Sequence, residues 1–274
     1  MRRSLPNTNK RDERAYLHIL NGDFSRDLWE KAGFPGGSLV WRETYLEGPL
    51  PETDDLSVFR TARAGYLASF DELTGIGAER LYRHLQKMDD AVLTLPPDAA
   101  LMLWFDSCIF DQTILMRILY LLGRRQNGMP EVFLYCCKGD CLEEQDFQQG
   151  FDQKIRLLSH DLAVAGKAWE YFLKHDAAGM RALAAQADFA RLPAMAAALL
   201  RCADEVPDQD GLSRTQRQIL QIAAGGRRSF LEIFSGLDAF EEFPFLGDTA
   251  CRRLLDQLVG RGLLKSVEGG YELP

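Results

Sequence analysis

The sequence predicts an α/β fold: a parallel sheet layered with helices, Rossmann-like in its first half, then a helical connector and a C-terminal winged helix-turn-helix. Three observations support this prediction. Short apolar runs alternate with segments of helical periodicity in the first half of the chain, which is typical of a parallel sheet covered by helices. The following stretch is helical throughout. The last stretch, 211–274, has three short helical segments before two short strands.

Four apolar runs supply the predicted strands, near residues 16–20, 38–42, 100–105 and 131–136. The first strand ends in the turn sequence Asn21-Gly22-Asp23. The helix after it repeats apolar residues at a spacing of four until Gly33, a typical helix stop. Further amphipathic helices are expected within 54–70, 77–89 and 111–125.

The remaining chain divides into two predicted parts. Residues 150–205 carry helical patterns whose alanine-rich faces bury little area alone, so we expect them to pack against another part of the protein. After a turn-rich linker at 207–211, Ser213 and Gln216 have the spacing of a capping box at the start of a short helix. A third helix is expected to begin at Asp248, before a hairpin around Gly269.

Length and composition predict a protein of more than one domain. The 274 residues exceed what one compact domain usually holds, and the 46% hydrophobic content permits a sizeable core. No apolar run reaches the roughly 18 residues of a membrane span, and the basic start lacks a secretory signal. We therefore expect a cytoplasmic protein with no membrane partner. Its expected parts are a disordered lead-in (1–13), an α/β domain (14–140), a helical connector (141–206) and a winged-helix-like domain (207–274).

Five motifs along the chain resemble those of a bacterial family with a domain of unknown function. They are LHILNGD at 17–23, WRETYLEGPLP at 41–51, LWFDSCIFDQ at 103–112, LSRTQRQIL at 212–220 and PFLGD at 244–248. The resemblance touches both ends of the chain and implies no particular activity. One departure stands out: where the family has Glu-His-Asp, this sequence has Asp106, Ser107 and Cys108. Any chemistry that relatives perform with that histidine is missing here.

Polar side chains follow the first three predicted strands. Ligands bind at the carboxyl ends of the strands in parallel sheets, so we expect these residues to converge on one rim. The motif at 41–51 would form one wall, with its glycine and prolines fixing the direction of Glu47. The candidate ligand-binding residues are Asn21, Asp23, Arg42, Glu43, Glu47, Asp106 and Asp111.

Each of these residues has a structural alternative. Asp23 can cap the helix that follows it, and Asp111 can interact with the first turn of its own helix. Arg42 can form a buried ion pair with Glu43 or Asp106. The common position of the residues after successive strands is what favours a shared site, and no catalytic residue is assigned.

Several kinds of site have no support in the sequence. It contains no G-x-G-x-x-G fingerprint, P-loop, G-x-S-x-G elbow or H-E-x-x-H motif. His18 is expected in the core, and the other three histidines at the surface. Cys136, Cys137 and Cys141 cluster without a second ligand group, so no metal site is assigned and the thiols are expected to stay reduced. Mg²⁺ would suit a carboxylate-rich rim, but no motif supports it, and the cofactor remains open.

The candidate nucleic-acid-binding residues lie in and after the third helix of the winged-helix-like domain: Arg252, Arg253, Arg261 and Lys265. Helix 248–259 is the expected recognition helix, with its leucines toward the core of the domain and its arginines exposed. The alternative is that this helix packs against the connector at 159–205, with the arginines paired to acids such as Asp161 or Glu170. Residues 211–274 carry eight Lys/Arg and eight Asp/Glu, a less basic balance than DNA readers usually have.

Three functions remain open. The first is a regulator whose α/β domain senses a small molecule and whose winged helix binds DNA. The second is a hydrolase or transferase that uses the carboxylates and arginine of the α/β domain on a small polar or phosphorylated substrate. The third is a non-enzymatic scaffold. The net charge of −8 at pH 7 argues against bulk nucleic-acid binding by the whole chain. Small molecule, DNA and a second copy of the chain are the candidate partners.

Overall fold

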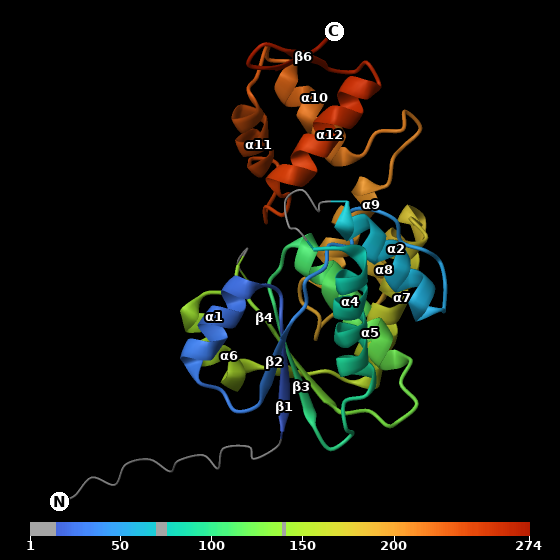
Figure 1. Ribbon diagram of the computed structural model, residues 1–274, viewed down its shortest axis with the longest axis vertical. Coiled ribbons are helices and arrows are strands. Elements are labelled where there is room, and N and C mark those ends of the chain that lie inside the picture. Colours follow the sequence, from blue (N-terminus) through green and yellow to red (C-terminus); the bar gives the residue numbers. More distant parts are fainter. Residues whose placement is uncertain (1–14, 70–75, 139–140) are drawn as a thin grey trace, which may run out of the picture.

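A computed structural model describes residues 15–69, 76–138 and 141–274. These residues form an α/β structure with a five-stranded sheet of order β2-β1-β3-β4-β5 (Figure 1). The strands are β1 (Tyr16–Leu20), β2 (Gly37–Val40), β3 (Ala100–Phe105), β4 (Glu131–Cys136) and β5 (Ile155–Arg156). The predicted lead-in, 1–13, lies outside the described residues.

The first four strands are parallel, as the alternation of strands and helices predicts. β5 pairs antiparallel with β4 and was not predicted, because a two-residue strand carries no readable periodicity. The chain passes from β1 outward to β2 and then returns to form β3 on the other side of β1. The strand order therefore reverses between β1 and β3, and such a switch point is the usual ligand site of an open parallel sheet.

Helices cover both faces of the sheet (Figure 1). They are α1 (Asp23–Ala32), α2 (Leu56–Ala68), α4 (Ala78–Leu93), α5 (Ile109–Gly123), α6 (Glu144–Gln153), α7 (Ser159–Leu173), α8 (Ala177–Gln186) and α9 (Met195–Glu205). On one face, Trp104 of β3 packs with Trp29 of α1 and Phe147 of α6. On the other face, the adjacent Leu103 shares a core with Ile118 of α5. Successive strand residues thus serve opposite layers.

The helices of the predicted connector complete the core on the α5 face. Trp169 of α7 and Leu199 of α9 are buried in the same cluster as Leu103 of β3. α5 is apolar around most of its circumference because it lies between the sheet and these helices. The expectation that residues 150–205 pack against another part of the protein is met by this layer.

The C-terminal module has its own small core. It consists of α10 (Arg214–Ala223), α11 (Phe230–Asp238), α12 (Asp248–Gly260) and an antiparallel hairpin of β6 (Lys265–Val267) and β7 (Gly270–Glu272). Ile219, Ile233 and Leu255, one from each helix, meet in its centre. The predicted capping box of Ser213 and Gln216 starts α10, and Ser229 with Glu232 forms another at α11.

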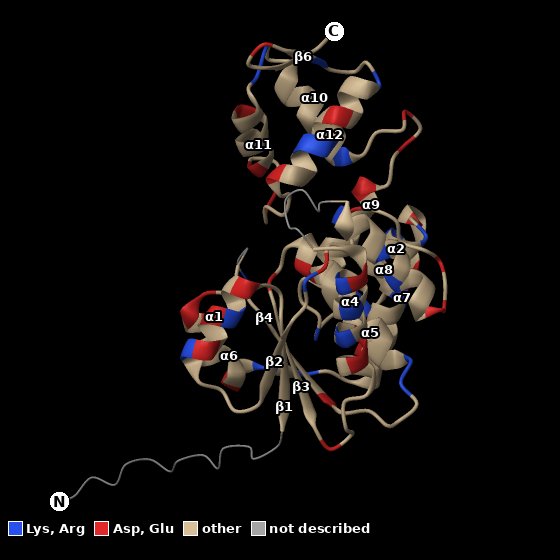
Figure 2. Cartoon of the chain, in the orientation of Figure 1, with Lys and Arg blue, Asp and Glu red and all other residues tan. Residues whose placement is uncertain are grey.

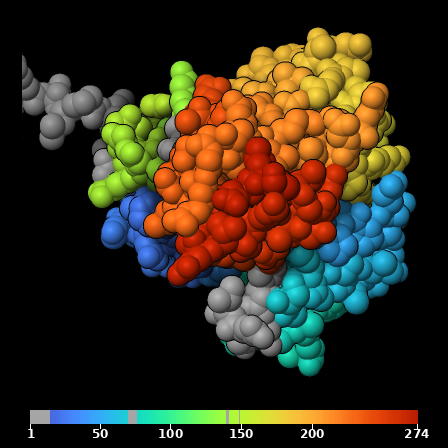
Figure 3. Space-filling view, turned by 90° about the horizontal axis from the view of Figure 1, so that it is seen from above, coloured from blue at the N-terminus to red at the C-terminus, as the bar shows by residue number. Residues whose placement is uncertain are grey.

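The module lies beyond the carboxyl ends of the parallel strands (Figure 1). Seen from above, its orange and red segments lie over the centre of the molecule, between the blue and green segments on one side and the cyan and yellow segments on the other (Figure 3). Basic and acidic residues both occur on the module in the view of Figure 2. Among the described residues, no helix combines the length and the apolar character needed to cross a membrane.

Candidate ligand-binding cavity

The loop between β2 and α2, which carries the motif at 41–51, has a fixed conformation. Trp41 and Tyr45 are buried, and the Trp41 indole donates to the Tyr45 hydroxyl at 3.2 Å. Gly48 has a φ of 77°, and a Cβ atom there would lie 2.5 Å from the ring of Tyr66 on α2. Any other residue at position 48 would be strained and would collide with this ring. The loop therefore needs its glycine in order to lie against α2.

Arg63 of α2 stabilises the loop at 41–51 through an ion pair and hydrogen bonds to its main chain. Its side chain is fully buried and pairs with Glu43, with Nη2 2.6 Å from Oε1 and Nε 3.2 Å from Oε2. Further guanidinium donors reach the main-chain oxygens of Thr44 (2.5 Å), Glu47 (2.6 Å) and Pro49 (3.2 Å). A single buried guanidinium thus satisfies one carboxylate and three carbonyls, which removes the usual penalty of burying such groups.

Glu47 points from this loop toward the C-terminal module. Its Oε2 atom accepts a hydrogen bond from the Tyr66 hydroxyl at 3.0 Å and from Arg253 Nη1 of α12 at 2.6 Å. The same Arg253 nitrogen also contacts the Tyr66 hydroxyl. Burial, and then the Glu47 carboxylate, raise the pKa of Tyr66 to about 12, so the phenol stays protonated as the donor. We call these three residues the Glu47 cluster.

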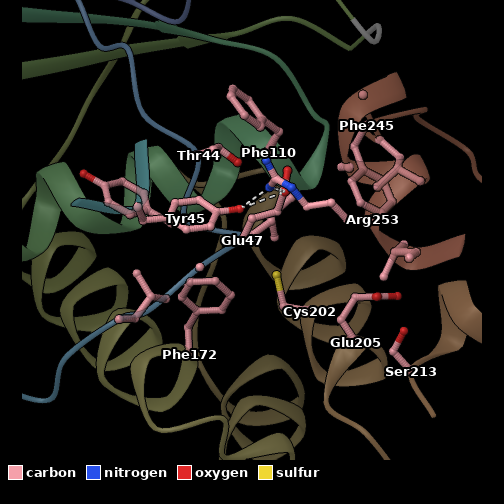
Figure 4. Close-up of a pocket in the computed structure, with 18 of the residues that line it drawn as sticks. Thr44, Tyr45, Glu47, Phe110, Phe172, Cys202, Glu205, Ser213, Phe245 and Arg253 are labelled. Atoms are coloured by element: carbon pink, nitrogen blue, oxygen red, sulfur yellow. Dashed lines mark hydrogen bonds and ion pairs between the residues drawn. The ribbon is translucent and has the colours of Figure 1, made fainter. Parts of the chain in front are cut away.

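A cavity of about 900 Å³ lies beside the Glu47 cluster (Figure 4). This volume is in the range of small-molecule sites. In Figure 4, Tyr45 and Phe172 line one side and Phe245 the other, with Glu47 and Arg253 joined between them. The lining comes from the 41–51 loop, from α2, α5, α7, α8 and α9, and from the C-terminal module. Its apolar members include Tyr45, Leu46, Leu50, Phe110, Phe172, Met180, Cys202, Val206, Phe245, Leu246 and Leu254, and its polar members include Arg42, Glu43, Thr44, Glu47, His175, Glu205, Ser213, Gln216, Arg253 and Gln257.

A second polar contact joins the C-terminal module to α9. Arg201 of α9 is 8% exposed and binds Glu241, which follows α11, through two parallel hydrogen bonds of 2.8 and 2.9 Å. Its remaining nitrogen donates to Glu205 at 2.5 Å, and Glu205 also accepts from the Thr215 hydroxyl of α10 at 2.7 Å. Glu205 and Glu47 both line the cavity, so the module contacts the rest of the chain on two sides of it.

The predicted site residues fall into separate places. Glu43, Glu47 and Arg42 line the cavity, but the Glu43 carboxylate already forms an ion pair with Arg63. Arg42 pairs with the exposed Asp23, not with Glu43 or Asp106 as the structural alternative supposed. The cap of α1 is Gly22 without a side-chain bond, so Asp23 serves this ion pair and not the cap.

Asn21, Asp106 and Asp111 meet at the switch point between β1 and β3, apart from the cavity lining. The Asn21 amide donates to Asp111 at 2.7 Å and to Asp106 at 3.3 Å. Both carboxyls are buried, at 3% and 1% exposure for Asp106 and Asp111. Burial and the neighbouring Asp106 charge raise the pKa of Asp111 well above its ordinary value of 3.8. The proximity of the two buried carboxyls therefore favours the protonated form of Asp111.

Cys108 caps α5 beside these carboxyls. Among the described residues, ligand atoms of Asp106, Cys108 and Asp111 lie within 4.8 Å of one another. Main-chain N–H groups of Asp106 and Cys108 and the Asn21 amide already donate to the carboxylate oxygens. A thiol is also a poor ligand for Mg²⁺, which takes oxygen atoms. The arrangement suits a protonated carboxyl better than this cation.

His18 lies in the core, as predicted. Its Nδ1 accepts from the Trp104 indole at 3.0 Å, and its Nε2 lies 3.2 Å from the Pro35 carbonyl oxygen. Both contacts are satisfied by a neutral ring with the proton on Nε2. Burial lowers the pKa of His18 to about 4, and the hydrogen bond to Pro35 offsets part of this effect.

The four candidate nucleic-acid-binding residues have different surroundings. Arg252 is exposed, with its guanidinium 3.7 Å from the centre of the Phe230 ring, and Lys265 is exposed on β6. Arg253 belongs to the Glu47 cluster, so it pairs neither with Asp161 nor with Glu170 of α7. Arg261 donates to the main-chain oxygens of Gly211 (2.6 Å) and Asp210 (3.0 Å), which ties α12 to the linker.

Sequence reasoning missed the residues that organise the cavity: Arg63, Tyr66 and Arg201. Each lies on a helix and has the spacing of an amphipathic face. The partners are distant in sequence: 14 or more residues away for Arg63, 19 for the Tyr66–Glu47 contact and 40 for the Arg201–Glu241 contact. The available signal was the Gly48 turn, which indicates a close approach of another side chain.

No model of a protein family matches the chain, and no curated protein matches it in sequence.

Proposed function

We propose that the protein is a regulator that senses a small molecule in the cavity beside the Glu47 cluster and responds through its C-terminal module. The observation that carries this proposal is the lining of the cavity, which comes both from the α/β part and from α12 of the module. A ligand that contacts both the α/β part and the module changes the free energy needed to separate them. If it binds one arrangement of the two parts more tightly than another, it shifts the population toward that arrangement.

DNA is the candidate partner of the module. Three helices followed by an antiparallel hairpin support a winged helix-turn-helix, in which α12 occupies the position of the recognition helix. Arg252 and Lys265 are exposed there, whereas Arg253 faces the cavity. In this proposal the protein binds DNA weakly while Arg253 is paired with Glu47, because that basic side chain of α12 then faces the cavity and cannot contact a phosphate.

A gel-shift titration of the full chain against genomic fragments at low salt tests the regulator. We expect retention that weakens as salt rises, and that weakens further in the Arg252→Ala, Lys265→Ala double variant, since each lost phosphate contact reduces counterion release. Arg83→Ala, Lys87→Ala on the exposed face of α4 is the matched control, because it removes two basic side chains outside the module. No retention at any salt concentration would exclude DNA and leave a protein-interaction scaffold as the role of the module.

One observation favours the enzyme alternative: the carboxyls of Asp106 and Asp111 lie at the switch point, where α/β enzymes bind substrates. A carboxyl with a raised pKa is a suitable general acid. Their burial, and their absence from the cavity lining, weigh against contact with a substrate. Membership in the bacterial family that the motifs resemble, a cytoplasmic location and a homodimer stay predictions.

A further inference from the structure

We propose that the cavity binds an amphipathic carboxylic acid, whose carboxylate replaces the Glu47 side chain on Arg253 and Tyr66. This inference rests on the proposed function, because it specifies the chemical class of the ligand for the same cavity.

The Glu47 cluster is a carboxylate-binding arrangement that the chain fills with its own side chain. Two donors from different elements, the Tyr66 hydroxyl and Arg253 Nη1, converge on one carboxylate oxygen at 3.0 and 2.6 Å. A guanidinium and a phenol in this arrangement recognise any carboxylate of similar placement. All three residues line the cavity, so an entering carboxylate can approach the same donors.

Glu47 is the lining carboxylate best able to leave its place. Its side chain is 28% exposed, and it can turn toward solvent without losing a buried partner. Glu43 is held by the buried Arg63, and Glu205 by Arg201 and the Thr215 hydroxyl. Removal of Glu43 would leave the buried Arg63 guanidinium without its charge partner, which is costly. Removal of Glu205 would break its hydrogen bonds with Arg201 and the Thr215 hydroxyl, although Arg201 would keep Glu241.

The rest of the lining defines the body of the ligand. Tyr45, Leu50, Phe172, Met180 and Leu254 present apolar surface around the cavity. An alkyl or aromatic body gains free energy by leaving water for such a surface. Glu43, Glu47 and Glu205 in the lining each already hold a guanidinium, so an amine head group would have to displace an arginine from its carboxylate, which disfavours amines.

Isothermal titration of the full chain with decanoate, decanol and decylammonium tests this inference, with decanol below its solubility limit and the two ions below their micelle concentrations. The three probes share one alkyl chain and differ in head group. We expect decanoate to bind more tightly than the other two by about tenfold or more, because a charge-assisted hydrogen bond distinguishes it. Equal binding of decanoate and decanol would contradict the carboxylate site while the proposed ligand cavity stands. Failure of all three probes to bind would contradict both.

Two variants assign the effect to the Glu47 cluster. Arg253→Met removes the main donor, and we expect it to weaken decanoate binding by about tenfold while decanol binding is unchanged. The adjacent Arg252→Met is the matched control, since Arg252 does not line the cavity. Glu47→Gln weakens the internal competitor, so decanoate should bind severalfold more tightly, a gain that a misfolded protein cannot give. An unchanged or weaker affinity in Glu47→Gln would overturn the proposal.

Discussion

His18 and Asp111 are buried polar residues with specific hydrogen-bond partners, and burial perturbs the ionisation of both. His18 is held neutral between Trp104 and Pro35, and Asp111 is held beside Asp106. Their pKa shifts have opposite consequences for stability. The lowered pKa of the histidine reduces the free energy of unfolding as pH falls. The raised pKa of the carboxyl reduces it as pH rises.

The Asp111→Asn variant should gain stability relative to the wild type as pH rises from 4 to 7. The folded pKa of Asp111 lies above its ordinary value of 3.8, so its contribution is complete below that value and is lost as pH rises through the folded pKa. Asparagine keeps an acceptor and stays uncharged. Urea unfolding at pH 4.5 and pH 7 measures the difference, with Asp256→Asn on the surface of α12 controlling for the loss of one charge. A difference that does not change with pH would show that Asp111 ionises as freely in the folded chain as in the unfolded one.

His18 should make the wild type sensitive to acid. Its folded pKa is about 4 against an ordinary 6.5, so its contribution is complete above pH 6.5 and is lost as pH falls toward 4. The linkage corresponds to roughly 2 kcal/mol between pH 7 and pH 5. The free energy of unfolding of His18→Gln should therefore fall less steeply over this interval than that of the wild type. The exposed His160→Gln is the control, and parallel curves for His18→Gln and the wild type would refute the assignment.

At the scale of the element, the loop at 41–51 is ordered by α2 rather than by its own turn chemistry. Gly48 allows the close approach of Tyr66, and Arg63 satisfies Glu43 and three carbonyls of the loop. The direction of Glu47 toward α12 follows from this support.

Removal of Arg63 should be among the more damaging changes in the α/β part. Arg63→Met leaves Glu43 buried without its partner, and we expect a loss of about 3–5 kcal/mol in the free energy of unfolding. The Arg63→Met, Glu43→Gln double variant should recover part of that loss, because no charge is then left buried alone. Chemical denaturation of the two variants and of Glu43→Gln completes the cycle. Strict additivity would contradict a direct coupling between the two side chains.

Elements with a local signal could be predicted from the sequence, and contacts between distant elements could not. The parallel strands followed from apolar runs, and the start of α10 followed from its capping box. β5 was missed because two residues carry no pattern. The separation of Asp106 and Asp111 from Glu47 was missed because side-chain direction after a strand depends on the loop. Arg253 was expected to face outward, and its link to Glu47 spans 206 positions of the chain.

At the scale of the whole molecule, two of the ion pairs that join the C-terminal module to the rest of the chain differ in character. The Arg201–Glu241 pair is mostly buried, with side-chain exposures of 9% and 10%, and the Arg253–Glu47 pair is at 32% and 28%. The buried pair is costly to break, whereas a partly exposed pair contributes little and exchanges partners readily. The module is thus expected to pivot near α9 and to open on the side of the Glu47 cluster, across the cavity.

The central claim, that a ligand occupies this cavity, is tested most directly by fluorescence titration with 8-anilinonaphthalene-1-sulfonate, an apolar anion. Leu50→Trp with Leu254→Trp reduces the cavity from the 41–51 loop and from α12. Val58→Trp with Leu200→Trp also adds two indole side chains, at positions that are 49% and 44% exposed and outside the lining. The account predicts a saturable site in the wild type and in the surface double variant, and an affinity lower by about tenfold or more in the cavity double variant. Equal affinities in all three proteins, or no saturable binding to the wild type, would contradict it.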